Sequence, residues 1–175
     1  MLEGLTSGDE NLITKKAFLA AGLVAGGRTN HWRIYLEVPG NRQHQERFIR
    51  LDMAMGQVDG DGNALKGQLV IKSVSYLPAN AETKLQTISL DTEPTVGDII
   101  ATIVNKRREY YLYHESGQGC RWWCSVVLED LHDAGYIRSG DLREAREVLR
   151  YLWSSSRRRQ EKPMREGTFE YGRNP

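Results

Sequence analysis

The 175-residue chain carries a net charge of +1, which excludes a global field that would attract nucleic acid or a membrane surface. Its hydrophobic (39%) and charged (27%) fractions are those of an ordinary soluble domain with a real core. The longest apolar run, residues 17–25, is too short to span a bilayer, and we see no signal peptide. The two cysteines lie one helical turn apart, where disulfide geometry is rarely met. We therefore expect reduced thiols and a cytoplasmic protein.

The first half of the chain predicts a β-rich region. Residues 17–24 are apolar without a clear period and indicate a buried strand, although a short helix also fits. Residues 31–38 and 48–53 are rich in aromatic and β-branched side chains and predict an antiparallel hairpin with a long tip. Residues 68–76 predict a third strand, and residues 84–90 a weaker fourth strand at an edge of the sheet.

A loop is predicted over residues 56–67, between the strand at residues 48–53 and the strand at residues 68–76. Within it, acidic and amide side chains alternate in residues 59–63, as the oxygen ligands of a calcium loop do. However, Ala64 and Val70 stand where that motif needs its turn glycine and its bidentate glutamate. We therefore predict a plain turn, and no metal or cofactor.

The second half predicts helices with one short strand between them. The Thr95 hydroxyl and a carboxylate three residues later form a capping sequence for a helix that runs to about Arg108. Residues 110–113 indicate a short strand. Helices are predicted from residue 120 to 133 and, with an amphipathic stripe, over residues 142–152.

This order of elements predicts an α+β fold in which an antiparallel sheet packs against helices. We assign residues 13–156 to a single α+β domain, residues 1–12 to a flexible N-terminus and residues 157–175 to a basic, irregular tail. Three consecutive arginines at residues 157–159 could touch an acidic partner. Because glutamates lie nearby, a solvated helix end is the commoner meaning of this pattern.

Cys120 is the candidate nucleophile, because it lies at the predicted start of a helix. A helix N-terminus exposes unpaired N–H groups and the positive end of the helix dipole, and both favour a thiolate. The preceding Gly119 allows a substrate to approach the backbone closely. Cys124 falls on the apolar face of the same helix and is predicted to be core. The pattern alone leaves Cys120 open to the same structural interpretation.

A thiol nucleophile needs a base, and the chain offers four histidines. His44 lies in a predicted hairpin tip and His132 on the outer part of a helix, so we expect both to be solvated. His31 begins a predicted strand, and His114 precedes Cys120 by six residues. The residues alone leave either one as the partner, or as a half-buried structural histidine.

Two segments resemble motifs of a known superfamily. Residues 30–36 (NHWRIYL) look like a histidine followed by an aromatic and aliphatic strand, and residues 119–123 (GCRWW) resemble an Asn-Cys-Gln-x-Trp motif at a helix start. Both are similar to the circularly permuted papain-like superfamily, which includes lecithin:retinol acyltransferase-like and PPPDE-type proteins, with NlpC-like peptidases as relatives. The resemblance covers residues 30–137. Gly119 departs from it, because the superfamily usually has asparagine there.

The resemblance implies a permuted papain-like fold in which the base precedes the nucleophile in the chain. It implies that Cys120 is the nucleophile, that His31 is the general base, and that a polar residue of the next strand orients the imidazole. If the hairpin pairs His31 with residues 52–55, Asp52 is the best candidate for that role. A surface strand position is an equally good interpretation of Asp52.

Other residues could complete such a site. Gln118 or His114 could line an oxyanion site beside the Cys120 backbone N–H. Trp32 and Trp123 could shape an apolar acyl site, although tryptophan beside a core helix more often packs.

The leading hypothesis is a cysteine-dependent acyl hydrolase or acyltransferase that acts on an amide, ester or thioester through a thioester intermediate. The alternative is a non-catalytic module of the same fold that binds a small molecule or a protein in the same cleft. Nucleic-acid binding would show a steep salt dependence, and the near-neutral charge argues against it. The placement of Cys120 relative to His31, and the pocket beside them, distinguish the first two hypotheses.

Overall fold

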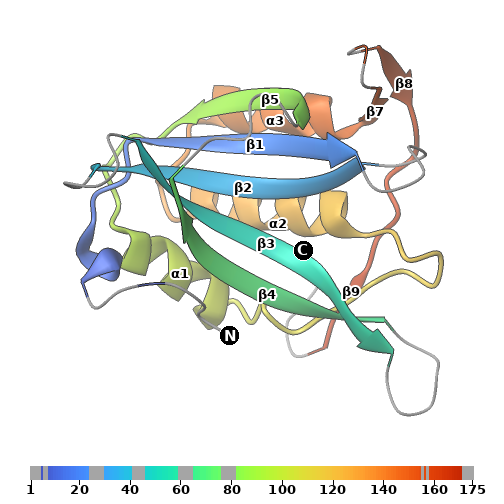
Figure 1. Ribbon diagram of the computed structural model, residues 1–175, viewed down its shortest axis with the longest axis horizontal. Helices are drawn as coiled ribbons and strands as arrows, with labels where there is room; N and C mark the ends of the chain where they lie inside the picture. Colours follow the sequence, from blue (N-terminus) through green and yellow to red (C-terminus); the bar gives the residue numbers. More distant parts are fainter. Residues whose placement is uncertain are drawn as a thin grey trace.

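The chain folds as one antiparallel sheet with helices packed against one of its faces (Figure 1). The computed structural model describes residues 5, 8–23, 30–40, 46–58, 65–75, 82–154, 156 and 158–170. The main sheet contains β1 (Lys16–Leu23), β2 (Asn30–Val38), β3 (Arg47–Val58), β4 (Leu65–Val74), β5 (Glu82–Ser89), β6 (Tyr111–Leu112) and β9 (Thr168–Phe169). A separate ribbon pairs β7 (Tyr151–Trp153) with β8 (Arg159–Glu161). The helical elements are η1 (Asp9–Asn11), α1 (Val96–Asn105), α2 (Cys120–Asp133) and α3 (Ser139–Leu149).

The strand order in the main sheet is β5-β1-β2-β3-β4-β6-β9, and every pair in it is antiparallel. In Figure 1, α2 and α3 lie behind the sheet. The α+β prediction is therefore confirmed at the level of an antiparallel sheet packed against helices. The predicted weak edge strand is β5, which forms one edge of the sheet. None of the helices in the described ranges is long and apolar enough to cross a membrane.

Strand β2 places its side chains alternately on the two faces of the sheet. Trp32, Ile34 and Leu36 are fully buried in the core that the helices cover. Since side chains alternate along a strand, His31 and Arg33 project from the opposite, open face. The predicted strand over residues 31–38 is confirmed, and its alternation decides which residues can reach the site.

Strands β2 and β3 separate halfway along β2. The candidate site lies at this parting of the two strands, where their backbone pairing has ended. Their antiparallel pairing ends at Ile34 and Leu51, so the next pair, Arg33 and Asp52, is not joined by the ladder. Strand β3 stays paired with β4 well beyond this point, as far as Val58. In Figure 1 the β3–β4 ribbon accordingly bends away from β1 and β2.

The predicted loop over residues 56–67 is wrong at both ends, because β3 extends to Val58 and β4 begins at Leu65. Its two flanking glycines reflect close approach of the strands. A Cβ on Gly56 would lie 2.7 Å from the Lys66 carbonyl oxygen, and one on Gly67 would lie 2.5 Å from a methionine sulfur of β3. The calcium-like residues 59–63 and His44 lie outside the described residues.

The starts of α1 and α2 agree with the sequence, whereas α3 begins three residues before the predicted residue 142 and ends at Leu149, before β7. Thr95 caps α1, and a capping box with Asp98 is complete, as predicted. Helix α1 ends at Asn105, three residues earlier than predicted. Helix α2 begins at Cys120 and is followed by Gly135 in a left-handed conformation (φ 81°), which suits a residue without a Cβ.

Both terminal segments contain ordered structure. In the predicted flexible N-terminus, Asp9 of η1 is buried and accepts a 2.6 Å hydrogen bond from Arg47. The predicted irregular tail contributes β8 and β9, and Phe169 of β9 is buried in the core. Both the segment around Asp9 and the segment around Phe169 therefore form part of the packed structure.

Candidate active site

Cys120 is the first residue of α2 and lies at the opening between β2 and β3. Its side chain is almost fully buried (9% exposed). The first hydrogen bond of the helix joins the Trp123 N–H to the Gly119 carbonyl at 3.0 Å, and no side chain caps the start. The N–H groups of the first turn therefore have no capping side chain among the described residues.

Gly119 is required by close packing in front of the cysteine. The Tyr111 hydroxyl donates a 2.8 Å hydrogen bond to the Gly119 carbonyl. A Cβ on Gly119 would lie 2.6 Å from that hydroxyl and 3.1 Å from a ring carbon of Tyr113, and the φ angle is 158°. Any side chain at this position, asparagine included, would have to displace the tyrosines.

His31 and Asp52 meet across the parting of β2 and β3. The His31 Nε2 atom lies 2.6 Å from Asp52 Oδ1. Arg33 donates from Nε to Asp52 Oδ2 at 2.9 Å, and the Arg50 guanidinium lies 3.7 Å from the same oxygen. The Asp52 side chain is only 7% exposed, so its charge is balanced by these three basic side chains.

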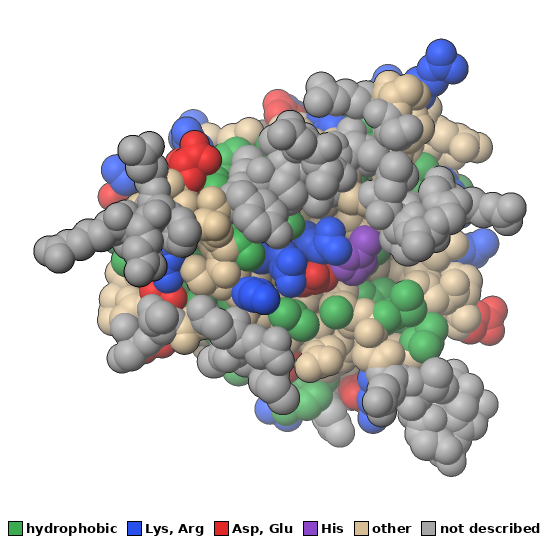
Figure 2. All heavy atoms as spheres, viewed as in Figure 1, with side chains coloured by type: hydrophobic (Ala, Val, Ile, Leu, Met, Phe, Trp, Pro, Cys, Tyr) green, Lys and Arg blue, Asp and Glu red, His purple; other side chains and the backbone are tan. Residues whose placement is uncertain are grey.

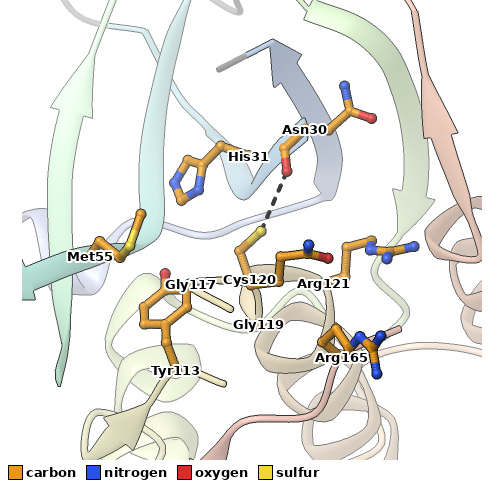
Figure 3. A pocket seen from close by; sticks show the side chains of 10 residues that line it. Asn30, His31, Met55, Tyr113, Gly117, Gly119, Cys120, Arg121 and Arg165 are labelled. Carbon is orange, nitrogen blue, oxygen red and sulfur yellow. Dashed lines mark hydrogen bonds between the residues drawn. The ribbon is translucent and has the colours of Figure 1, made fainter. Parts of the chain in front are cut away.

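Cys120 completes the contacts of the His31 imidazole. With Nε2 held by Asp52, Nδ1 is the nitrogen left for the cysteine, and His31 and Cys120 face each other in Figure 3. The Cys120 thiol also lies 3.6 Å from the Asn30 carbonyl oxygen, to which it can donate. Asn30 is next to His31 in β2, and this carbonyl lies where β2 has no β3 partner.

Electrostatics favour a charged imidazole in this arrangement. Burial lowers the pKa of His31, but the hydrogen bonds with Asp52 and Cys120, together with their charges, outweigh burial and raise it to about 9. Burial likewise raises the pKa of Asp52, but the hydrogen bond and charge of His31, with Arg33, hold it below its usual value. At neutral pH an imidazolium is therefore held beside Cys120, and such a cation stabilises a cysteine thiolate.

The open face of the sheet carries this charge cluster at its surface. Figure 2 shows basic side chains gathered around an acidic one, beside a histidine, in a hollow of that face. The His31 side chain is 21% exposed there, and the Arg33 and Arg50 side chains are 26% and 24% exposed. Solvent therefore reaches the imidazole, while Cys120 is approached through a pocket.

That pocket is small, with a volume of about 80 Å³. Its lining residues come from four separate parts of the fold: Asn30, His31, Met55, Tyr113, Gly117, Gln118, Gly119, Cys120, Arg121 and Arg165. The volume suits the reacting end of an extended chain better than a whole drug-sized ligand, which occupies several hundred Å³. Met55 is more than half exposed and gives the pocket an apolar rim.

Arg121 is a buried cation that forms no ion pair with a carboxylate in the part of the chain that the structure describes. Its guanidinium donates to the carbonyl oxygens of Leu149, Lys162 and Pro163, each at 3.0 Å. Burial lowers the pKa of Arg121, and the neighbouring Cys120 opposes that shift. Hydrogen bonds from this guanidinium thus join the start of α2 to the C-terminal segment.

Several residues predicted for the site lie elsewhere. Trp32 and Trp123 are fully buried in the core and do not line the pocket. Trp32 neighbours His31 on a strand and therefore faces the other side of the sheet. Trp123 donates a 2.9 Å hydrogen bond to the Arg108 carbonyl. The prediction that these two tryptophans shape an acyl site is therefore wrong, and both pack in the core.

His114, His132 and Cys124 are also absent from the lining of the pocket. His114 interacts with Ser116 at 2.9 Å. His132 is half-buried and lies 2.6 Å from the Ile137 carbonyl oxygen, so the expectation that it is solvated is wrong. Cys124 is fully buried, as predicted, and burial raises the pKa of its thiol.

Sequence reasoning missed the pocket residues that come from distant segments. Met55 and Arg165 carry no local motif, and only the fold brings them to Cys120. Tyr113 lies in a tyrosine-rich segment, residues 110–113, which predicted a strand but not a pocket. Its hydroxyl donates to the Met53 carbonyl, which the parting of the strands leaves without a β2 partner.

Comparisons with known proteins give one match. A family model described as "Domain of unknown function (DUF7770)" matches residues 20–170, which include every residue of the site described above. No curated protein and no solved structure gives a significant match.

Proposed function

The chain belongs to the DUF7770 family, whose function is unknown, and we propose that it is a cysteine-dependent acyl hydrolase or acyltransferase. One observation carries the proposal: Cys120 at a helix start, His31 and Asp52 form a continuous series of contacts beside a pocket. Each member has the surroundings that its role requires. Nucleophile, base and orienting acid in this order are the general arrangement of thiol and hydroxyl acyl-transfer sites.

Asp52 and His31 have distinct tasks in this mechanism. Asp52 holds Nε2 and thereby fixes the ring so that Nδ1 is directed at Cys120. It also stabilises the imidazolium, because its carboxylate lies 2.6 Å from the ring and is only 7% exposed. The Cys120 thiol gives its proton to His31, and the resulting thiolate attacks the acyl carbonyl carbon, so that a C–S bond forms and the carbonyl π electrons move to the oxygen.

The oxyanion requires hydrogen-bond donors, and two are suitably placed. The Cys120 backbone N–H lies in the first turn of α2, and the Gln118 side chain lines the same pocket. The Gln118 side-chain amide makes no hydrogen bond within the described part of the chain, so it is available to a substrate oxygen. Donors aimed at a developing negative charge lower the barrier without reorganisation.

The intermediate collapses when the carbonyl re-forms and the bond to the leaving group breaks. The leaving amine, alcohol or thiol takes its proton from His31, which leaves a thioester on Cys120 and a neutral imidazole. His31 then removes a proton from water or another acceptor. That oxygen or nitrogen attacks the thioester and expels the Cys120 thiolate, which completes hydrolysis or transfer.

We further propose that the fold is a circularly permuted papain-like one. The base strand β2 precedes the nucleophile helix α2 in the chain, and the orienting Asp52 comes from the strand beside the base. The antiparallel sheet with the cysteine helix packed on one face supports this assignment. Gly119 differs from the asparagine of that superfamily, and the packing of Tyr111 accounts for the difference.

A small activated ester tests the proposal directly. We expect 4-nitrophenyl acetate to acetylate Cys120 in the folded protein, detected as released nitrophenolate and as a modified peptide by mass spectrometry. Cys120→Ala should abolish the adduct, and His31→Ala should slow its formation roughly 100-fold or more. Cys124→Ala is the matched control and should acylate like the wild type. A folded protein in which Cys120 stays unmodified would favour the binding-module alternative.

A further inference from the structure

Arg165 is the feature of the site that the mechanism does not use. It lines the same small pocket as Cys120, and its side chain is exposed. It has no hydrogen-bond or ion-pair partner within the described residues. Arg165 therefore adds a cation to the edge of the pocket, and no counter-ion for it lies among the described residues.

Two anchors fix the position of Arg165 in the chain. On one side, Arg121 binds the carbonyl oxygens of Lys162 and Pro163. On the other side, Gly167 packs so closely that a Cβ there would lie 2.3 Å from the Tyr111 hydroxyl. We call residues 162–167 the strap.

The strap continues into the sheet, because β9 pairs with β6 immediately after it. Met164 packs against the core one residue before Arg165. The backbone of Arg165 is therefore held from both directions, while its side chain stays exposed at the edge of the pocket. Because the backbone is already ordered, binding of a ligand would restrict only the side chain.

The charge of the pocket is one-sided. None of its ten lining residues is acidic, whereas Arg121 and Arg165 are both cationic. The adjacent Glu166 is not among the lining residues. Figure 3 shows Met55 and Arg165 on opposite sides of the His31–Cys120 pair, so an apolar rim faces a cationic one across the nucleophile.

We propose that Arg165 selects the substrate of Cys120, and that this substrate is an acyl compound with a carboxylate or similar anionic group close to the reacting carbonyl. The inference rests on the proposed thiol chemistry and adds the substrate class to it. The guanidinium offers a planar fork of N–H donors that matches a carboxylate in two-point contact. The apolar part of the substrate lies against Met55, on the other side of Cys120.

Two alkylating agents of nearly equal size test this charge preference without knowledge of the natural substrate. Iodoacetate is an anion and iodoacetamide is neutral. With either, the Cys120 thiolate forms a C–S bond and iodide leaves. The measured quantity is the ratio of the two second-order rate constants at Cys120. We expect Arg165→Gln to lower this ratio roughly three- to tenfold, mainly through the iodoacetate rate.

Two further variants make the result specific. Arg165→Lys keeps the charge and should restore most of the ratio. Arg158→Gln removes an exposed arginine that precedes β8 and does not line the pocket, so it should leave the ratio unchanged. Added salt should reduce the wild-type preference, because an exposed charge is screened.

The outcomes separate this inference from the proposed function. If iodoacetamide labels Cys120 rapidly but Arg165→Gln leaves the ratio at the wild-type value, Arg165 does not select an anion and the inference is overturned while the thiol chemistry stands. If Cys120 resists both reagents in the folded protein, the proposed function fails, and the inference with it. A ratio lowered equally by Arg158→Gln would assign the effect to net charge and would also overturn it.

Discussion

The Nε2 atom of His31 lies 2.6 Å from Oδ1 of Asp52, beyond the last backbone pair that joins their two strands. A continued ladder would place Arg33, not His31, opposite Asp52. The side-chain pair therefore spans diagonally across the parting of β2 and β3. Cys120 contacts the imidazole in the region where the β2–β3 pairing has ended. The same interruption of the sheet therefore allows both the His31–Asp52 contact and the His31–Cys120 contact.

The pKa of His31 should depend on Asp52. In the wild-type protein it is about 9, because hydrogen bonds and charges outweigh the effect of burial. In Asp52→Asn the carboxylate contribution is lost, and we expect the His31 pKa to fall by one unit or more. Titration of the imidazole resonances by NMR measures this. Asp98→Asn, which removes an exposed carboxylate at the start of α1, should leave the value unchanged. An unaltered pKa in Asp52→Asn would contradict the assigned pairing.

The same shift predicts how stability varies with pH. The folded protein binds the His31 proton more tightly than the unfolded chain, whose value is near 6.5. The stabilisation is therefore fully present below about pH 6.5 and is lost as pH rises through about 9. The difference in unfolding free energy between wild type and His31→Gln should shrink across this window, on the order of 3 kcal/mol. Urea denaturation at a series of pH values measures it, and a difference that grows with pH is incompatible with a raised pKa.

The sequence predicted those parts of the site that depend on local order. Cys120 at a helix start follows from the change from a polar loop to an apolar helix, and the helix begins there. The resemblance, together with a hairpin between two recognisable strands, indicated Asp52 as a partner of His31, and the two side chains meet although the ladder ends at Leu51. The alternation of β2 also excludes Trp32 from the His31 site, because neighbouring residues of a strand cannot face the same side of a sheet.

The remaining parts depend on contacts between distant segments. Residues 162–167 have no periodicity, so nothing local indicates that Arg121 would bind their carbonyl groups. The glycines at 56 and 67 signal a turn by composition but serve the close approach of two strands. The early end of the β2–β3 ladder has no local signature, and the Tyr113 hydroxyl that binds the Met53 carbonyl there comes from a distant segment.

Gly119→Ala should damage both stability and reactivity. Its Cβ would lie 2.6 Å from the Tyr111 hydroxyl, and the tyrosine or the start of α2 would have to move. We expect a loss of about 1–3 kcal/mol in unfolding free energy and a slower acylation of Cys120. Gly140→Ala is the matched control, because a Cβ there meets nothing within 4 Å and lies in a helix.

The control should change stability in the opposite direction, by up to about 1 kcal/mol, since alanine is the better helix former. Adding Tyr111→Phe to Gly119→Ala removes the clashing oxygen and should recover part of the acylation rate. Thermal unfolding and the nitrophenyl ester assay measure the two effects. Equal stability of Gly119→Ala and Gly140→Ala would refute the packing argument for the glycine.

Gln118 should contribute to the reaction rate but not to folding. Its side chain lines the pocket, and no described residue holds its amide. If that amide donates to the oxyanion, Gln118→Ala should slow acylation of Cys120 by the ester roughly 10- to 100-fold. In this variant, alkylation of Cys120 by iodoacetamide should stay near the wild-type rate, because displacement of iodide forms no oxyanion. His114→Ala, in the same loop but outside the pocket, should leave both reactions unchanged. Parallel losses in both reactions for Gln118→Ala would instead mean that Gln118 positions the cysteine.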